Sequence, residues 1–249
     1  MPKHVLHISP GSAPCRAVLL HLHLLRELET PDLADLEVRH LDLQAGEHKG
    51  DEYLAIHPRG VVPTLETPWG ALTESRAIMR YLAELAQVAA PDADTLYPRS
   101  LYQRARVNEW LDWDLGSFYK AIGAAVYPKL FGDLEPDHAQ LEAVAKAFSV
   151  LERELAEKIY VAGPRLTIAD LSLAMGATML RLVNLEVDDS PNVEGWLIRM
   201  QSIPGWNEVN APFEQWHASI HGEDSPSAGA DAAPTNAAKG EASPPRPSA

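Results

Sequence analysis

The first third of the chain alternates short strand-like runs with segments of helical periodicity. The strand-like runs are apolar, or alternate polar with apolar side chains, and lie at residues 5–8, 36–43, 62–66 and 70–73. Residues 15–28 and 75–86 instead place apolar side chains at the spacing of an amphipathic helix. The last two strand-like runs flank Pro68-Trp69-Gly70, which predicts a hairpin. Residues 1–86 therefore predict one small mixed sheet with helices on its faces.

The second part of the chain is helical in pattern almost throughout. Residues 87–98 carry two prolines and predict a linker, and residues 99–221 follow it with helical spacing. Thr167 is followed three residues later by Asp170, a variant of the capping box that marks a helix start. One apolar stripe predicts a buried helix face and consists of Val107, Trp110, Leu111, Leu115 and Phe118. The expected fold class is an α/β domain followed by an all-α domain.

The end of the sequence differs in composition from both predicted domains. Of the 28 residues in 222–249, 20 are Ala, Pro, Ser or Gly, and none is a large apolar residue. Such a segment buries too little apolar surface to offset its ordering entropy. We expect a disordered tail without chemistry.

Charge and composition remove several classes of function. The formal net charge of −14 argues against nucleic acid and anionic membranes as partners. No apolar run reaches the ~18 residues of a membrane-spanning helix, and the first residues lack the features of a secretory signal. The single cysteine excludes an internal disulfide and favours a cytoplasmic setting. His217 and His221 are four residues apart but lack a third ligand, so no metal site is expected.

Candidate chemistry begins at Ser12-Ala13-Pro14-Cys15, between the first predicted strand and helix. Thioredoxin-like redox proteins carry C-x-x-C at this junction, with the first position at a helix N-terminus that stabilises a thiolate. Ser12 occupies that position, so dithiol chemistry is lost, but its hydroxyl can donate a hydrogen bond to a bound thiolate. Alternatively, Ser12 is only the N-cap of the helix. Cys15 lies a turn inside the helix and is expected to be a buried structural thiol.

Two later segments favour ligand binding over simple capping. Val62-Pro63 opens a predicted strand, a suitable context for a cis bond that would leave the Val62 backbone free to pair with an extended peptide. Ser75 would begin a helix whose free N–H groups can hold a carboxylate. Glu74 could pair with an ammonium group, and Arg76 could bind a carboxylate. Taken alone, Glu74 and Ser75 would be an ordinary helix cap.

In this order and spacing, the segments resemble the soluble glutathione transferases, in particular the serine-type delta, epsilon and theta classes. The resemblance covers roughly residues 4–217 and rests on Pro10–Arg16, Leu41–His48, His57–Leu65, Glu74–Leu82 and Ser202–Trp206. It implies a thioredoxin-like N-terminal domain, an all-helical C-terminal domain and a homodimer. It also implies an enzyme of detoxification that conjugates glutathione, as co-substrate, to a small hydrophobic electrophile.

The same resemblance implies roles for individual residues. The catalytic residue is Ser12, which would hydrogen-bond the glutathione sulfur. The residues expected to bind glutathione are His48, Val62, Pro63, Glu74, Ser75 and Arg76. Of these, Val62 would pair with the cysteinyl unit, Glu74 and Ser75 would hold the γ-glutamyl end, and His48 would lie near the glycyl end. The residues expected to border the electrophile pocket are Pro14, Asp112, Leu115 and Tyr119.

One position departs from the family pattern. The delta-like pattern often has a histidine in the loop before the cis proline, whereas this chain has Gly60. The glycyl carboxylate would then be held differently, with Arg59 and Lys49 as the available cations.

From the sequence alone, three alternative functions remain to be distinguished. The same thiolate would serve a dehalogenase, a dehydrochlorinase or a peroxidase. A non-catalytic binding module of the same architecture is a second alternative, and Ser12 disfavours a third, a glutaredoxin-type reductase. The electrophile itself is not defined by the sequence, because the pocket residues fall in stretches without motifs.

Overall fold

The computed structural model describes residues 4–28, 31–132, 134–186 and 190–222. These ranges include most of both predicted domains. The expected tail at residues 222–249 lies outside the described residues apart from Gly222.

Four short strands form one mixed sheet in the order β2-β1-β3-β4. The strands are β1 (Val5–Ile8), β2 (Glu37–His40), β3 (Thr64–Thr67) and β4 (Gly70–Thr73). β1 pairs in parallel with β2 and antiparallel with β3, and all four of its residues are buried. A central strand covered on both faces is buried along its whole length, so its apolar residues do not alternate with exposed polar ones. Its one polar residue, His7, lies 2.7 Å from the Glu66 carboxylate.

The strands lie where the sequence pattern predicts them, although β3 begins at Thr64 rather than Val62 and β2 is shorter than expected. The run at residues 5–8 and the hairpin of β3 and β4 are confirmed. The strand expected over residues 36–43 ends at His40, because Asp42 bends the chain. Its side chain accepts hydrogen bonds from the backbone N–H groups of Gln44 and Ala45, at 2.8 and 2.9 Å. Asp side chains commonly form such turns, which compete with extended pairing.

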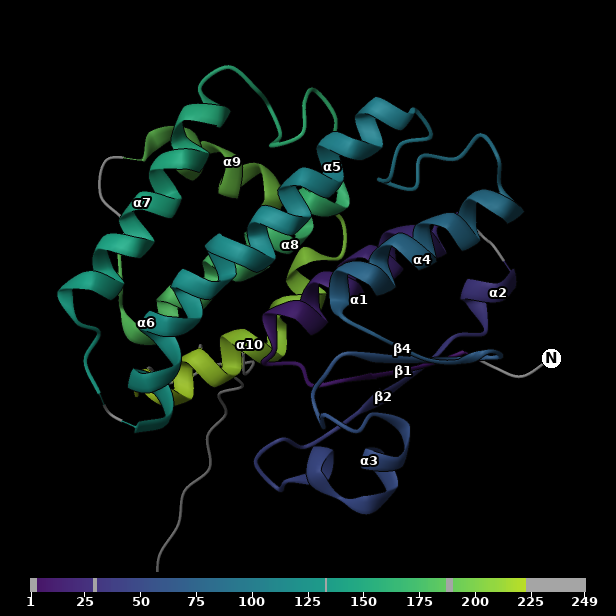
Figure 1. Ribbon diagram of the computed structural model, residues 1–249, viewed down its shortest axis with the longest axis horizontal. Helices are drawn as coiled ribbons and strands as arrows, with labels where there is room; N and C mark the ends of the chain where they lie inside the picture. The colour runs from purple at the N-terminus through teal and green to yellow at the C-terminus, as the bar shows by residue number, and fades with distance from the viewer. Residues whose placement is uncertain (1–3, 29–30, 133, 187–189, 223–249) are drawn as a thin grey trace, which may run out of the picture.

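Helices cover both faces of this sheet (Figure 1). On the face toward the second domain lie α1 (Ala13–Arg26) and α4 (Ser75–Ala89). On the opposite side lies α3 (Asp51–Ile56), preceded by a 3-10 turn, η1 (Glu47–Lys49). α3 and α2 (Pro31–Ala34) are too short to carry a recognisable helical period, so the sequence pattern missed both.

The second domain is built from helices throughout its described part. In chain order these are α5 (Leu101–Trp113), the π-turn η2 (Asp114–Phe118), α6 (Tyr119–Gly132), α7 (His138–Leu155), α8 (Ile168–Thr178), the 3-10 turn η3 (Met179–Val183), α9 (Pro191–Gln201) and α10 (Trp206–His221). Every residue of α8 is buried, so this helix is the centre of the domain.

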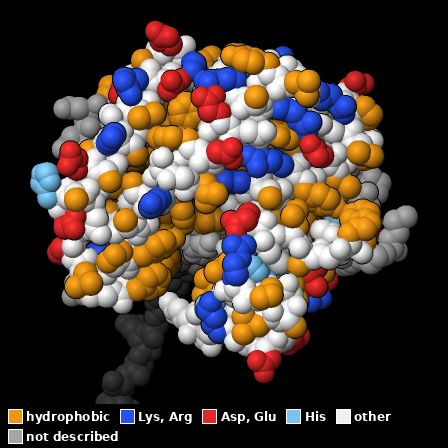
Figure 2. Space-filling view, in the orientation of Figure 1, with side chains coloured by type: hydrophobic (Ala, Val, Ile, Leu, Met, Phe, Trp, Pro, Cys, Tyr) orange, Lys and Arg blue, Asp and Glu red, His pale blue; other side chains and the backbone are white. Residues whose placement is uncertain are grey.

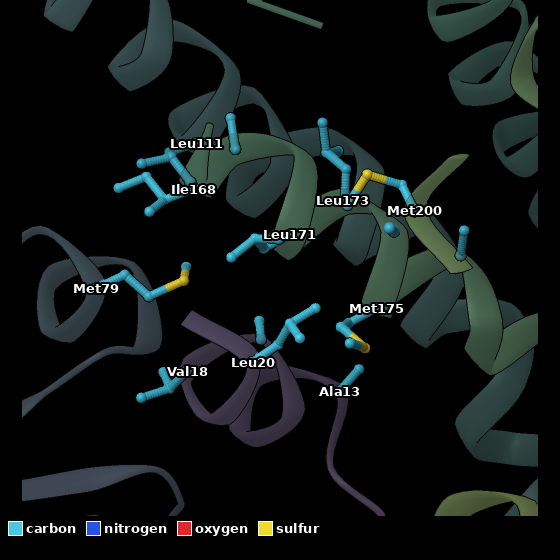
Figure 3. Close-up of a cluster of buried hydrophobic side chains, with 14 of the residues drawn as sticks. Ala13, Val18, Leu20, Met79, Leu111, Ile168, Leu171, Leu173, Met175 and Met200 are labelled. Carbon is cyan, nitrogen blue, oxygen red and sulfur yellow. The ribbon is translucent and has the colours of Figure 1, made fainter. Parts of the chain in front are cut away.

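The two domains share one apolar core, in which α1 packs against α8 (Figure 3). Leu20 of α1 lies opposite Leu171 and Met175 of α8, whereas Val18 lies on the other side of α1, the side on which Met79 of α4 is found. All five side chains are fully buried. The sheet domain and the helical domain are therefore held together by close-packed apolar contact, which resists relative motion.

A buried polar cluster also joins the domains. The π-turn η2 brings Asp114 into the interior, where its Oδ2 accepts hydrogen bonds from Arg76 Nε at 2.9 Å and from Ser172 Oγ at 2.5 Å. Arg76 stands in the first turn of α4 and Ser172 in α8. A buried carboxylate is tolerated here because a guanidinium and a hydroxyl stabilise it. The cluster thereby holds the start of α4 against the helical domain.

The start of α8 carries the predicted capping box. Thr167 and Asp170 exchange their capping bonds, which confirms the sequence motif. The fully buried Asp170 carboxylate also accepts hydrogen bonds from Val161 N at 2.9 Å and Trp196 Nε1 at 3.1 Å. It therefore connects α8, α9 and the preceding loop.

We expect Asp170→Asn to lower the free energy of unfolding by about 2–4 kcal/mol, because the new amide places an N–H₂ group against N–H and O–H donors. The matched control is Asp137→Asn, at the exposed capping box of α7, where Asn is an equally good cap and the loss should stay below about 0.5 kcal/mol. Urea unfolding measures both. Equal losses in the two variants would contradict a special role for the buried box.

Candidate functional site

A cleft of about 850 Å³ lies where the two domains meet. Figure 2 shows the surface hollowed between the lobe that carries α3 and the helical domain, with apolar side chains on the side of the helices. The sheet domain contributes residues 9–12, 14, 40–44, 47–49 and 60–62 to its lining. The helical domain contributes an apolar wall made of Tyr119, Tyr127, Phe131, Met179, Pro212 and Trp216. The sheet side thus carries nearly all the polar and charged groups of the lining, and the helical side is mostly aromatic.

Ser12 lies in this cleft at the N-terminus of α1. It occupies the N-cap position, yet within the described residues its side chain makes no capping hydrogen bond. Its backbone N–H is held by Ser9 O at 3.1 Å, and its carbonyl accepts from Arg16 N at 3.0 Å. The first turn of α1 contains no acidic residue. A hydroxyl that does not cap its helix, beside the positive end of the helix dipole, can bind an anion in the cleft.

Cys15 is placed differently from Ser12. Its side chain is fully buried, and burial raises the pKa of the thiol to about 11. Hydrogen bonds with the Ser12 side chain and the Ser9 N–H lower that pKa by a smaller amount. A protonated, enclosed thiol is neither a nucleophile nor a metal ligand. The prediction of a structural thiol is confirmed.

The loop before β3 reaches the cleft through a cis peptide bond between Val62 and Pro63. Val62 lines the cleft, and Pro63 is buried behind it. The Tyr53 hydroxyl donates to Val61 O at 2.7 Å and lies 2.9 Å from Thr64 Oγ1, which holds both ends of the loop. In the described part of the chain, no hydrogen bond engages the N–H or C=O of Val62. Its backbone is therefore available to an extended ligand.

Gly60 and Lys49 form the rim on this side. Gly60 has φ +56°, and a Cβ there would lie 2.6 Å from the carbonyl oxygen of His48. A histidine could not replace it without moving the backbone. Lys49 Nζ donates to Gly60 O at 2.8 Å, and both Lys49 and His48 line the cleft. Arg59 instead forms an ion pair with Glu74 at 2.7 Å.

The expected anion site at the start of α4 lies outside the cleft lining but adjoins this loop. Glu74 has φ 69°, and its carboxylate is held by Arg59. Ser75 is buried as the first residue of α4, whose N-terminus lacks a side-chain cap among the described residues. Arg76, expected near the ligand, points into the domain interface and is bound to Asp114. A structural role for Arg76 follows from that contact.

The expected electrophile residues divide into two groups. Pro14 and Tyr119 line the cleft. Asp112 and Leu115 do not reach it: Asp112 lies 3.3 Å from Arg80 on α4, and Leu115 is 52% exposed on the surface. The π-turn at residues 114–118 shifts the helical phase between α5 and α6, so a helix face extrapolated from Asp112 to Tyr119 does not hold.

Sequence reasoning missed most of the aromatic wall. Tyr127 and Phe131 follow Tyr119 at steps of eight and four residues, which places all three on one face of α6. That spacing is a signal the sequence offered. Trp216 gave none, because it belongs to a distant helix and reaches the site only by packing against Gly11, where a Cβ would lie 3.1 Å from its ring.

Within the described residues there is no group of three or more His, Cys, Asp or Glu side chains that could hold a metal ion. The described helices also include none with the length and hydropathy to cross a membrane.

A cleft between a thioredoxin-like domain and an all-helical domain, with a serine at the N-cap of the first helix, is the arrangement of the glutathione-using transferases. Two family models match the chain: the glutathione S-transferase N-terminal domain over residues 6–90 and the C-terminal domain over residues 121–204. Glutathione S-transferase 2 of Anopheles gambiae is 34% identical over 197 residues, which are 79% of this chain and 90% of that protein. The chain therefore belongs to the glutathione S-transferase family and is an enzyme that conjugates glutathione.

Solved structures place it near the insect delta and epsilon classes. A delta-class glutathione transferase of Nilaparvata lugens superposes with a TM-score of 0.76 at 33% identity, covering 88% of this chain and 100% of that one. An epsilon-class glutathione S-transferase of the housefly, Musca domestica, gives 0.74 at 30% identity, covering 89% and 99%. The resemblance drawn from the sequence motifs is confirmed.

We expect Cys15 to resist thiol reagents in the native enzyme, because its thiol is enclosed and protonated. Titration with a chromogenic disulfide should find the one thiol of the chain only after denaturation. Rapid labelling of the folded protein, with parallel loss of activity, would instead assign Cys15 to the reactive site.

Proposed function

We propose that this enzyme attacks hydrophobic electrophiles with a glutathione thiolate that is stabilised by the Ser12 hydroxyl. The observation that carries the proposal is the position of Ser12, in the cleft at the start of α1 with no capping bond among the described residues. A free thiol has a pKa of about 8.5, so only a few per cent is ionised at neutral pH. A hydrogen bond to the charged sulfur contributes ~1.5–3 kcal/mol and the helix N-terminus ~0.3–1 kcal/mol. Together they make thiolate the main form.

The rest of glutathione would follow the polar side of the cleft. The unpaired backbone of Val62, preceding Pro63, supports pairing with the cysteinyl unit in the manner of an added strand. The N-terminus of α4 at Ser75 and the carboxylate of Glu74 would hold the γ-glutamyl carboxylate and ammonium groups. His48 would border the glycyl end, since it lines the cleft next to Lys49 and Gly60.

We assign the glycyl carboxylate to Lys49 rather than Arg59. The Arg59 guanidinium is occupied by Glu74 and by Thr73 Oγ1 at 3.1 Å. Lys49 lines the cleft, and the described hydrogen bonds of its ammonium go to backbone carbonyls alone. Its charge is therefore not neutralised and can attract a carboxylate.

The aromatic wall supports an apolar electrophile that carries one hydrogen-bond acceptor. The hydroxyls of Tyr119 and Tyr127 lie 2.6 Å apart, so one proton is shared between them and one can be donated to a ligand. The remaining wall of Phe131, Met179, Pro212 and Trp216 offers only apolar contact, apart from the indole N–H. Dehalogenation and peroxide reduction would use the same thiolate, but the similar proteins favour conjugation.

We further infer a homodimer in the cytoplasm, as the family resemblance implies. The single buried cysteine is compatible with a reducing compartment.

We expect Ser12→Ala to lower turnover with a generic aryl halide about tenfold to a hundredfold and to raise the pKa of bound glutathione by about 1–2 units. Glutathione affinity should be nearly unchanged, because most contacts lie elsewhere in the cleft. Steady-state kinetics and thiolate absorbance across pH measure both effects. The matched control is Ser9→Ala, also in the cleft lining. If Ser9→Ala reproduces the loss and Ser12→Ala does not, Ser9 is the thiol activator.

We expect Lys49→Met to raise the KM for glutathione about tenfold with little change in kcat, since it removes binding that is equal in ground and transition states. The wild type should prefer glutathione over its glycyl monoethyl ester, and the variant should lose that preference. Arg59→Met is the control. Loss of the preference in Arg59→Met alone would move the carboxylate site to Arg59.

A further inference from the structure

Behind the cleft wall lies a fully buried guanidinium that the proposed reaction does not use. Arg16 is 0% exposed and stands one helical turn after Ser12. Its Nη1 donates to Asn210 Oδ1 on α10 at 2.5 Å, and its Nη2 donates to Thr178 Oγ1 on α8 at 3.1 Å. The ring of Phe213 covers it at 3.9 Å. All of these partners are neutral.

The charge of Arg16 is not compensated within the described part of the chain. No described carboxylate lies within ion-pair distance of it, although a buried charge ordinarily has such a partner. Burial lowers the pKa of Arg16 to about 10, which leaves it charged at neutral pH. Glu214, the nearest acid on α10, is already held by Arg181 through two hydrogen bonds of 2.6 and 2.8 Å. A net positive charge therefore remains inside the protein.

This charge adjoins the cleft on several sides. Met179, a cleft residue, has its sulfur 3.5 Å from Arg16 Nη2. Phe213 lies between the cleft residues Pro212 and Trp216 in sequence, and its ring contacts that of Trp216. Protein rather than water therefore separates the Arg16 guanidinium from the cleft. Solvent for this reason only weakly screens the electric field of its charge in the cleft.

We propose that Arg16 is an electrostatic positioning residue whose uncompensated buried charge stabilises the glutathione thiolate at Ser12 across the protein wall. This inference rests on the proposed function of Ser12. Because Arg16 is enclosed by protein, it would act on the sulfur without touching it. It raises the potential at the start of α1, where the hydroxyl of Ser12 and the helix dipole act on the same group.

Other titratable groups face the cleft or Arg16, and the test leaves all of them unchanged. On the sheet side these are Cys15, His40, Asp42, Glu47, His48 and Lys49, and on the helical side Tyr119, Tyr127, Arg181 and Glu214. Asn210→Asp changes none of them. It places a carboxylate against the guanidinium with almost no change in shape, and so neutralises the charge in place. Asn210→Ala is the matched control, because it also loses the Asn210 bond to Trp206 O at 2.8 Å but leaves the charge uncompensated.

The measurement is the pH titration of thiolate absorbance in the full-length enzyme saturated with glutathione, together with the acid limb of kcat/KM. We expect Asn210→Asp to raise the pKa of the bound thiol by about 0.5–1 unit, which lowers the thiolate fraction on the acid side about threefold to tenfold. Asn210→Ala should titrate like the wild type. Identical titration of all three proteins would overturn the proposal.

A second pair of variants guards against misfolding at position 210. Arg16→Lys keeps a charge and should retain most of the wild-type thiol pKa, whereas Arg16→Met should raise it. Equal shifts in both would assign the effect to packing and overturn the electrostatic role.

Ser12→Ala, titrated in parallel, separates the inference about Arg16 from the proposed function of Ser12. If it leaves the thiol pKa unchanged, the proposed function of Ser12 fails; if it shifts the pKa and Asn210→Asp does not, only the inference about Arg16 fails.

Discussion

Burial of α1 on nearly every side is the constraint on which the rest of the molecule depends. The helix packs against α4, α8 and α10, and most of its residues are inaccessible to solvent. Its start, at Ser12, is consequently fixed by apolar contacts along the whole length of the helix rather than by the loop that carries it. A hydrogen bond to a thiolate stabilises only if the donor stays in place, so the apolar packing is part of the chemistry.

The same burial forces polar groups on the domain interface to find partners. Arg76 and Ser172 both donate to the Asp114 carboxylate, and His21 of α1 lies 3.1 Å from the Thr95 carbonyl oxygen. The Arg76–Asp114 and His21–Thr95 contacts each join a residue of the sheet domain to the helical domain or the linker, so they fix a register that apolar packing alone would leave degenerate. Arg16 differs because its hydrogen bonds go to neutral atoms, which do not cancel its charge, and its Nε has no partner among the described residues.

The sequence predicted the fold and the cleft residues Ser12, His48 and Val62 because these features depend on local signals. The strand at residues 5–8, the capping box at Thr167 and the Ser12 junction are each readable within a few residues. The aromatic half was mostly missed, since Tyr127, Met179 and Trp216 come from three separate elements that only tertiary packing brings together. Asp112 was wrongly predicted to border the cleft for a local reason that helix propensity does not reveal. One π-turn changes the helical phase after it.

The outer part of the aromatic wall has a consequence for how such an enzyme diversifies. Phe131 is 76% exposed and Tyr127 38% exposed, so their side chains contribute little to the core. Exchanging them should cost little folding free energy, because large losses come from buried positions. Ser12 stands on an element where almost every neighbour is fixed by packing. Substitutions on α6 can therefore change substrate specificity while purifying selection preserves α1. The two halves of one cleft can then evolve at different rates.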